Sequence, residues 1–144
     1  MLSHKKPPRT ISPACRVYGE RPGHLAYLHR FWFADKFIAY ACREDAMPMD
    51  QHQLMALVAP RTLYVASSSE DFGADPYGEF LAAKEAAEVW RLYGMENTLP
   101  TEFPALEQSV GNMVKYHCKV GKYSITAADW KYYYDCADKL FKTV

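Results

Sequence analysis

The order of a β-strand, an α-helix and a second β-strand in the second half of the chain constrains the fold most. Residues 62–66 form a short apolar run rich in β-forming side chains, with proline and arginine before it and three serines after it. Residues 76–93 carry apolar side chains at a 3.6-residue period and stop at Gly94, whereas residues 113–120 alternate between apolar and polar up to Gly121. Such an order forms a right-handed crossover between two parallel strands. The sequence therefore predicts an α/β fold with two parallel strands and helices that cover the sheet.

The segments before and after this unit indicate the domain outline. Residues 1–24 are rich in proline and glycine and show no periodicity, which predicts an irregular lead-in. Residues 25–40 carry apolar and aromatic side chains at steps of three and four, which predicts a helical region. Asp50 is placed to cap a short helix, and Thr126 is placed to cap a final one. Residues 25–144 are therefore expected to form one partial domain.

The predicted sheet is too small to be a complete one. A parallel sheet needs helices on both faces and commonly has four to six strands, about twice or more the number predicted here. We therefore expect the chain to correspond to the last third of a doubly wound α/β domain.

Composition excludes several partners. Lysine plus arginine equals aspartate plus glutamate at 17 each, so the chain lacks the broad positive charge that nucleic-acid and anionic-membrane binders use. The four cysteines (Cys15, Cys42, Cys118 and Cys136) have no metal-ligand spacing, which favours structural thiols over a metal site and leaves disulfides open. No apolar run is long enough for a signal peptide or a membrane anchor.

Functional residues of open α/β sheets lie in the loops beyond the carboxyl ends of the strands. The loop after the first strand contains Asp71, a candidate triad acid, and Asp75, which is better explained as the N-cap of the next helix. The loop after the second strand, residues 121–125, contains no histidine. His117 lies within the strand and His52 within a helix, where hydrogen-bonded structural roles are favoured. No serine has the Gly-x-Ser-x-Gly context of a nucleophile elbow.

Several long motifs resemble bacterial glucuronoyl esterases of carbohydrate esterase family 15. The resemblance extends from about Tyr27 to Leu140. The motifs that carry it are residues 43–54, 56–67 and 70–80, the pair Tyr116-His117 with Gly121, and residues 126–130.

The resemblance implies the C-terminal part of an α/β-hydrolase that cleaves glucuronic acid esters between xylan and lignin, with a serine, a histidine and a carboxylate and without a metal or cofactor. Asp71 falls on the position of the family's acid, which an upstream glutamate supplements or replaces in many members. Gly73 stands where members usually have a tryptophan that contacts the sugar. Tyr123 stands where they have the catalytic histidine, and Ser124 where an aspartate commonly follows. The serine elbow would lie before residue 1.

These departures predict a glucuronoyl-esterase-like fragment that is inactive on its own, because a tyrosine of ordinary pKa near 10 cannot shuttle protons at neutral pH. The alternative is a non-catalytic remnant that binds carbohydrate or protein. The expected partners are an ester of the glucuronoxylan type and a separately encoded N-terminal half. The resemblance also implies secreted or periplasmic relatives, although no signal peptide is recognisable here.

Overall fold

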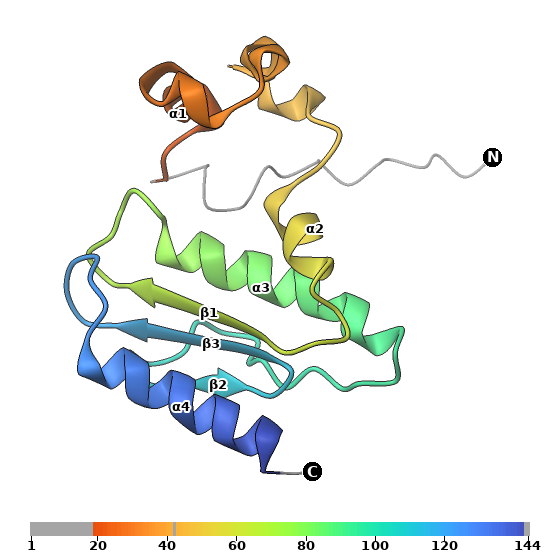
Figure 1. Cartoon of the computed structure of the whole chain (residues 1–144), viewed down its shortest axis with the longest axis vertical. Helices are drawn as coiled ribbons and strands as arrows, with labels where there is room; N and C mark the ends of the chain where they lie inside the picture. Colours follow the sequence, from red (N-terminus) through yellow and green to blue (C-terminus); the bar gives the residue numbers. More distant parts are fainter. Residues whose placement is uncertain (1–18, 42, 143–144) are drawn as a thin grey trace.

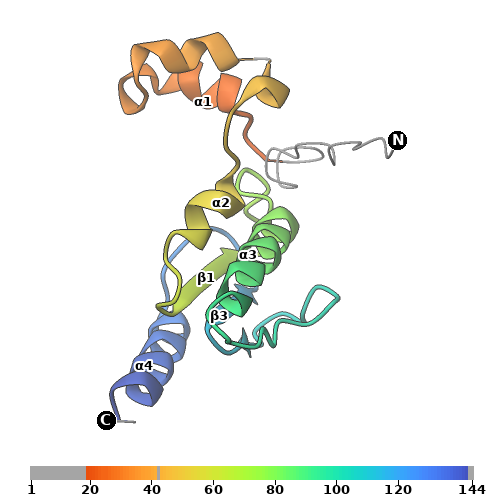
Figure 2. The same ribbon diagram turned by 90° about the vertical axis from the view of Figure 1, so that its right-hand side faces the viewer.

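The computed structural model describes residues 19–41 and 43–142, and its centre is a small sheet between two helices. Figures 1 and 2 show α3 along one face of the sheet and α4 along the other. The elements of this three-layer unit are β1 (Leu63–Ser68), α3 (Pro76–Arg91), β2 (Val110–Gly111), β3 (Val114–Lys119) and α4 (Ala127–Phe141). No helix in the described part of the chain is long and apolar enough to cross a membrane.

The predicted crossover is confirmed, but the sheet has a third strand. β1 and β3 pair in parallel, from Leu63 opposite Val114 to Ser68 opposite Lys119. β2 pairs with β3 in antiparallel orientation, which gives the order β1-β3-β2 and corrects the prediction of two parallel strands alone. Two residues are too few to show strand periodicity, so the sequence could not indicate β2. β1 is left as an edge strand among the described residues.

The turn between β2 and β3 requires glycine. Gly111 has a φ of +88°, and a Cβ atom built on it would lie 2.1 Å from the carbonyl oxygen of Val114. Only a residue without a side chain can adopt this conformation so close to the neighbouring backbone.

The two faces of the sheet differ in chemistry. Odd-numbered residues of β1 and even-numbered residues of β3 face α3, and Val65, Phe80, Trp90 and Tyr116 form the buried apolar core there. The opposite face carries His117 and polar neighbours towards α4. This division follows from the period of two along a strand, which sends successive side chains to opposite faces.

Three predicted helix caps are confirmed. Asp50 and Thr126 each form a capping box, at the starts of α2 (Gln51–Ala56) and α4. Asp75 accepts a hydrogen bond from the backbone N–H of Gly78 at the start of α3, and its own backbone is left-handed with a φ of 53°. The side-chain oxygens satisfy N–H groups that have no partner within the helix.

The predicted helical region over residues 25–40 is present, but as several short helices without one shared buried face. The structure has α1 (Pro22–Leu28) followed by the short 3₁₀ helices η2 (Arg30–Trp32), η3 (Asp35–Tyr40) and η4 (Glu44–Ala46). Extended backbone at Phe33 and Ala34 separates η2 from η3, so the apolar residues do not share one helical face. α1 also begins at Pro22, inside the predicted irregular lead-in, because proline is well tolerated at the first helical position. Residues 1–18 of that lead-in lie outside the described residues.

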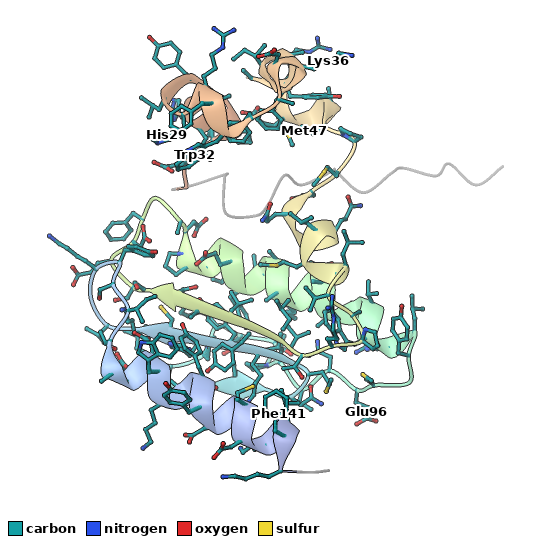
Figure 3. The ribbon with its side chains drawn as sticks, in the orientation of Figure 1. His29, Trp32, Lys36, Met47, Glu96 and Phe141 are labelled. Atoms are coloured by element: carbon teal, nitrogen blue, oxygen red, sulfur yellow. The ribbon has the colours of Figure 1, made fainter. Side chains whose placement is uncertain are left out.

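This N-terminal segment lies apart from the three layers, where Figure 3 labels His29, Trp32, Lys36 and Met47. The rings of His29 and Trp32 stack with their centroids 4.1 Å apart. Ala26 is the only residue of α1, η2 and η3 that is buried. The segment therefore contributes little to the core.

Candidate functional site

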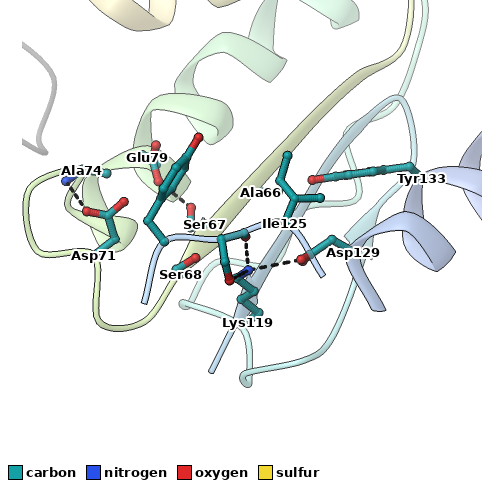
Figure 4. A pocket seen from close by; sticks show the side chains of 12 residues that line it. Ala66, Ser67, Ser68, Asp71, Ala74, Glu79, Lys119, Ile125, Asp129 and Tyr133 are labelled. Atoms are coloured by element: carbon teal, nitrogen blue, oxygen red, sulfur yellow. Dashed lines mark hydrogen bonds and ion pairs between the residues drawn. The ribbon is translucent and has the colours of Figure 1, made fainter. Parts of the chain in front are cut away.

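The loops that follow β1 and β3 meet at one edge of the sheet and enclose a pocket of about 260 Å³, shown in Figure 4. Two backbone hydrogen bonds join the loops, from Ser69 to the carbonyl of Lys119 and from Glu70 to the carbonyl of Gly121. The residues lining the pocket are Ala66, Ser67, Ser68, Asp71, Ala74, Glu79, Lys119, Tyr123, Ser124, Ile125, Asp129 and Tyr133. The sequence located this edge correctly, because the carboxyl ends of parallel strands meet there.

Two of the three predicted site residues line this pocket. Asp71 is partly buried, and its Oδ1 accepts a hydrogen bond from the backbone N–H of Ala74 at 3.3 Å. Tyr123 also lines the pocket, although its side chain is 79% exposed. The structure therefore brings the predicted acid and the residue at the predicted histidine position to one cavity.

Gly73 is exposed and does not line the pocket. Its carbonyl accepts a hydrogen bond from the backbone N–H of Glu20. A Cβ atom there would lie 3.6 Å from Oδ1 of Asp71, an ordinary contact, and the backbone is not left-handed. A methyl group would fit at this position, so nothing in the local geometry demands glycine.

The sequence did not indicate the pair formed by Ser67 and Glu79. The Ser67 hydroxyl donates to Oε2 of Glu79 at 2.6 Å, which connects the end of β1 to the first turn of α3. Burial raises the pKa of Glu79; the Ser67 hydrogen bond opposes this shift, and the nearby charges of Asp71 and Asp75 add to it. Strand alternation, which turns Ser67 towards α3, was the one signal that could have revealed the pair.

Glu79→Gln is expected to leave the free energy of unfolding at pH 7 unchanged or slightly higher. A carboxyl with a raised folded pKa destabilises the fold progressively as pH rises above its unfolded value of about 4.3. Glutamine keeps an acceptor for Ser67 and removes this charge. Urea unfolding from pH 4 to pH 7 should therefore show the variant gaining relative to wild type as pH rises. A variant that loses stability relative to wild type over that range would contradict this explanation.

A buried ionic network forms the inner wall of the pocket. Oδ2 of Asp129 lies 3.2 Å from Nζ of Lys119, and Oδ1 lies 2.9 Å from Nε2 of His117. Nζ of Lys119 also donates to the carbonyl and to the hydroxyl of Ser124, and so holds the loop that carries Tyr123. Thr126 donates to Oδ2 of Asp129 through its backbone N–H and its hydroxyl. The network thus joins β3, the loop after it and α4.

The charge of Asp129 is stabilised by these partners. Burial alone would raise the pKa of this carboxyl, but hydrogen bonds from His117, Thr126 and Lys119 outweigh burial and hold the pKa well below its usual range. An ionised carboxylate only accepts hydrogen bonds, so Nε2 of His117 carries the proton between them.

His117 is a structural histidine, as the sequence predicted. Its side chain is 0% exposed, and its Nδ1 lies 3.1 Å from the hydroxyl of Tyr64, which in turn lies 2.7 Å from the hydroxyl of Ser109. Burial raises the pKa of Tyr64 to about 12, so its hydroxyl stays protonated. The imidazole is buried, has both ring nitrogens engaged and does not line the pocket, so it has no direct contact with a molecule bound there.

The pocket combines an acid with no accessible general base of the imidazole type. Among its lining residues there is no histidine, and the Ser67 hydroxyl is directed to Glu79.

The other histidine and cysteine candidates lie outside the pocket. His52 lies in α2, where its Nδ1 is 3.7 Å from Oδ2 of Asp50. Within residues 19–41 and 43–142 no group of three or more histidine, cysteine, aspartate or glutamate side chains could hold a metal ion. Cys118 and Cys136 are buried free thiols, whereas Cys15 and Cys42 lie outside the described residues.

The match to a known family model covers the part of the site formed by the loop after β1 and by α3. The family model for glucuronyl esterase from fungi matches residues 19–94, more than half of the chain. The chain belongs to the glucuronoyl esterase family. Two curated members are similar in sequence. A carbohydrate esterase, MZ0003, from an unknown prokaryotic organism is 39% identical over 85% of this chain. The 4-O-methyl-glucuronoyl methylesterase of Hypocrea jecorina is 30% identical over 60% of it.

Solved structures of glucuronoyl esterases have the same arrangement. A promiscuous CE15 esterase from a marine bacterial metagenome matches 84% of this chain with a TM-score of 0.81 and 39% identity. The glucuronoyl esterase of Solibacter usitatus matches the same share with a TM-score of 0.78 and 42% identity. The chain spans 28% and 17% of the two curated relatives and about 30% of these structures. It is the C-terminal part of an α/β-hydrolase fold, as the sequence predicted.

Proposed function

We propose that this polypeptide carries the acid loop and the histidine loop of a glucuronoyl esterase site in altered form, and that residues 1–144 alone do not hydrolyse esters. The observation that carries the proposal is the shared pocket of Asp71 and Tyr123 at the carboxyl ends of β1 and β3. The substrate class of the ancestral site is an ester of glucuronic acid, which the name of the fungal relative supports.

The two altered positions, Tyr123 and Gly73, each lack a group that the family's reaction uses. Asp71 would orient an imidazole on the neighbouring loop, but the side chain available there is the phenol of Tyr123. A triad without its histidine loses the group that takes a proton from the nucleophile and returns it to the leaving alcohol. Gly73, at the predicted tryptophan position, offers no aromatic ring for a sugar to stack on.

The nucleophile is the second missing part. Residues 1–144 contain no Gly-x-Ser-x-Gly sequence, and the Ser67 hydroxyl, at the end of β1, donates to the carboxylate of Glu79. A serine hydroxyl without an adjacent base is a weak nucleophile. Loss of the whole triad in a serine hydrolase lowers the rate by about six orders of magnitude.

The purified polypeptide is therefore expected to release no alcohol from a benzyl ester of glucuronic acid above the rate of its Asp71→Ala variant. The measurement is chromatographic detection of benzyl alcohol, with an intact CE15 esterase as the positive control. Turnover that Asp71→Ala abolishes would overturn the proposal.

Tyr123→His serves as the second variant in the same assay. It is expected to remain inactive, because an imidazole in this loop would still have no activated serine to deprotonate. Hydrolysis by Tyr123→His would show that a hydroxyl within residues 1–144 can act as the nucleophile, and the account of the missing nucleophile would be wrong.

The second candidate is a non-catalytic binding function. Several large apolar side chains are exposed on the N-terminal segment and on α4, which is typical of a surface that meets another molecule. This observation favours a protein partner.

A further inference from the structure

A second pocket lies on the α3 side of the sheet, and we call it the aromatic pocket. It has a volume of about 240 Å³ and lies between the start of α3 and the loop of residues 95–109. Figure 2 shows this loop, in teal, on the side that carries α3 and away from α4. The aromatic pocket shares no lining residue with the pocket of Figure 4. The side chains that define it are Phe72, Asp75, Tyr77, Phe103 and Cys118.

Three of these side chains are aromatic, namely Phe72, Tyr77 and Phe103. The ring centroids of Tyr77 and Phe103 lie 5.9 Å apart and their planes are inclined by 47°, so the two rings can border one guest. Phe103 in turn packs against Phe80 and Tyr116, two fully buried core residues. The wall is therefore held in place by the core, and the faces of such rings attract cations.

Asp75 adds a negative charge to the aromatic pocket. Its side chain is buried, with the residue 6% exposed, and its Oδ1 accepts a hydrogen bond from the backbone N–H of Gly78 at 3.2 Å. No described residue donates to its Oδ2, and within residues 19–41 and 43–142 no basic side chain forms an ion pair with it. The positive end of α3 offsets part of the charge. A cation in the pocket would supply the missing counter-charge.

The surroundings of the aromatic pocket also favour a cation over an anion. Neither lysine nor arginine lines it. Acidic residues instead adjoin its lining residues along the chain, where Glu70 follows Ser69, Glu102 precedes Phe103 and Glu107 follows Leu106. Carboxylates gathered around a hollow raise the local concentration of cations and repel anions.

We infer that the aromatic pocket binds a small organic ammonium ion, of the quaternary class that choline represents. The methyl groups of such an ion would contact the rings, and its charge would face the rings and Asp75. A hydrated metal cation would not match apolar walls. A cavity of about 150 Å³ accepts benzene and drug-sized ligands fill about 300 Å³ or more, so the volume suits one head group. The inference does not rest on the proposed function, because the two pockets have no residue in common.

The test is titration of the chain with choline, followed by nuclear magnetic resonance. The reference ligand is the neutral analogue of choline that has a tert-butyl group in place of the trimethylammonium group. Choline is expected to bind with a Kd on the order of 1 mM, since a ligand of few atoms makes few contacts. It should bind at least about tenfold more tightly than the neutral analogue, because only the cation interacts with the ring faces and the carboxylate. Phosphocholine should bind more weakly than choline, because its phosphate would meet the acidic surroundings.

Two variants separate the charge from the rings. Asp75→Asn should weaken choline binding at least about fivefold and leave the neutral analogue unaffected. Its fold should persist, because asparagine caps helices and tolerates the left-handed backbone of this position. Tyr77→Leu keeps an apolar side chain but removes a ring, so it should cause the same selective loss.

Tyr93→Leu is the matched control, because Tyr93 is 56% exposed like Tyr77 but lies beyond the end of α3 and does not line the aromatic pocket. It should bind choline as wild type does, and far-ultraviolet circular dichroism should show the same helix content in all three variants. The inference would be overturned by the absence of saturable binding up to tens of millimolar choline, or by equal affinity for choline and the neutral analogue. Phosphocholine that binds as tightly as choline, or an equal loss in Tyr77→Leu and Tyr93→Leu, would overturn it too.

Discussion

Asp129→Asn is expected to lower the free energy of unfolding by about 3–5 kcal/mol, the usual cost of removing one partner from a buried ion pair. The carboxylate is 3% exposed and interacts with His117, Lys119 and Thr126. An asparagine side chain is neutral, so the buried ammonium of Lys119 would lose its counter-charge. The loop that Lys119 holds through Ser124 should loosen at the same time.

Urea unfolding followed by far-ultraviolet circular dichroism measures this effect. Asp138→Asn is the matched control, because Asp138 lies on the same helix and pairs with Lys142 at the surface. Exposed pairs contribute at most about 1 kcal/mol. Equal losses in the two variants would mean that the buried network contributes no more than a surface pair.

The contribution of Asp129 should depend on pH with a defined sign. A carboxyl with a lowered folded pKa contributes stability that is complete above its unfolded pKa, about 3.9, and is lost as pH falls through the folded value. The difference between wild type and Asp129→Asn should therefore be full at pH 6 and shrink below about pH 4. A difference that grows on acidification would contradict the assigned charge.

The network around Asp129 also contains a contact that the sequence could not predict. An aspartate hydrogen-bonded to a histidine at 2.9 Å resembles two members of a catalytic triad, yet both side chains are buried between β3 and α4. Alternation along residues 113–120 placed His117 on the face opposite the core, which was predictable. The partner of His117 was not predictable. Asp129 fits a capping position of α4, and a contact between a strand and a helix depends on how the two elements pack.

Regular periodicity explains what could be predicted of the fold. The crossover of β1, α3 and β3 has long apolar patterns and clear caps, so its elements were located to within about two residues. β2 lacks the length for any pattern, and α1 with its 3₁₀ helices has aromatic residues at mixed steps that resemble one helix. The pocket edge followed from topology, whereas the contact of Ser67 with Glu79 depends on the packing of α3.

Trp90→Ala is the second change with a large expected effect, about 3–5 kcal/mol of unfolding free energy. The indole is 1% exposed in the core between α3 and the sheet, and its Nε1 donates to the carbonyl of Arg61 at 3.1 Å. Alanine would leave a cavity and an unpaired carbonyl just before β1. This tryptophan therefore helps to fix α3 on β1, and with it the contact of Ser67 with Glu79.

Trp130→Ala is the matched control, since Trp130 is half exposed on α4. It should cost clearly less than Trp90→Ala, because about half of its side-chain area stays in water after folding. Urea unfolding of both variants gives the comparison. Similar losses would show that α4 relies on Trp130 for its own packing, and Trp130 would then belong to the core of this polypeptide instead of to an exposed surface.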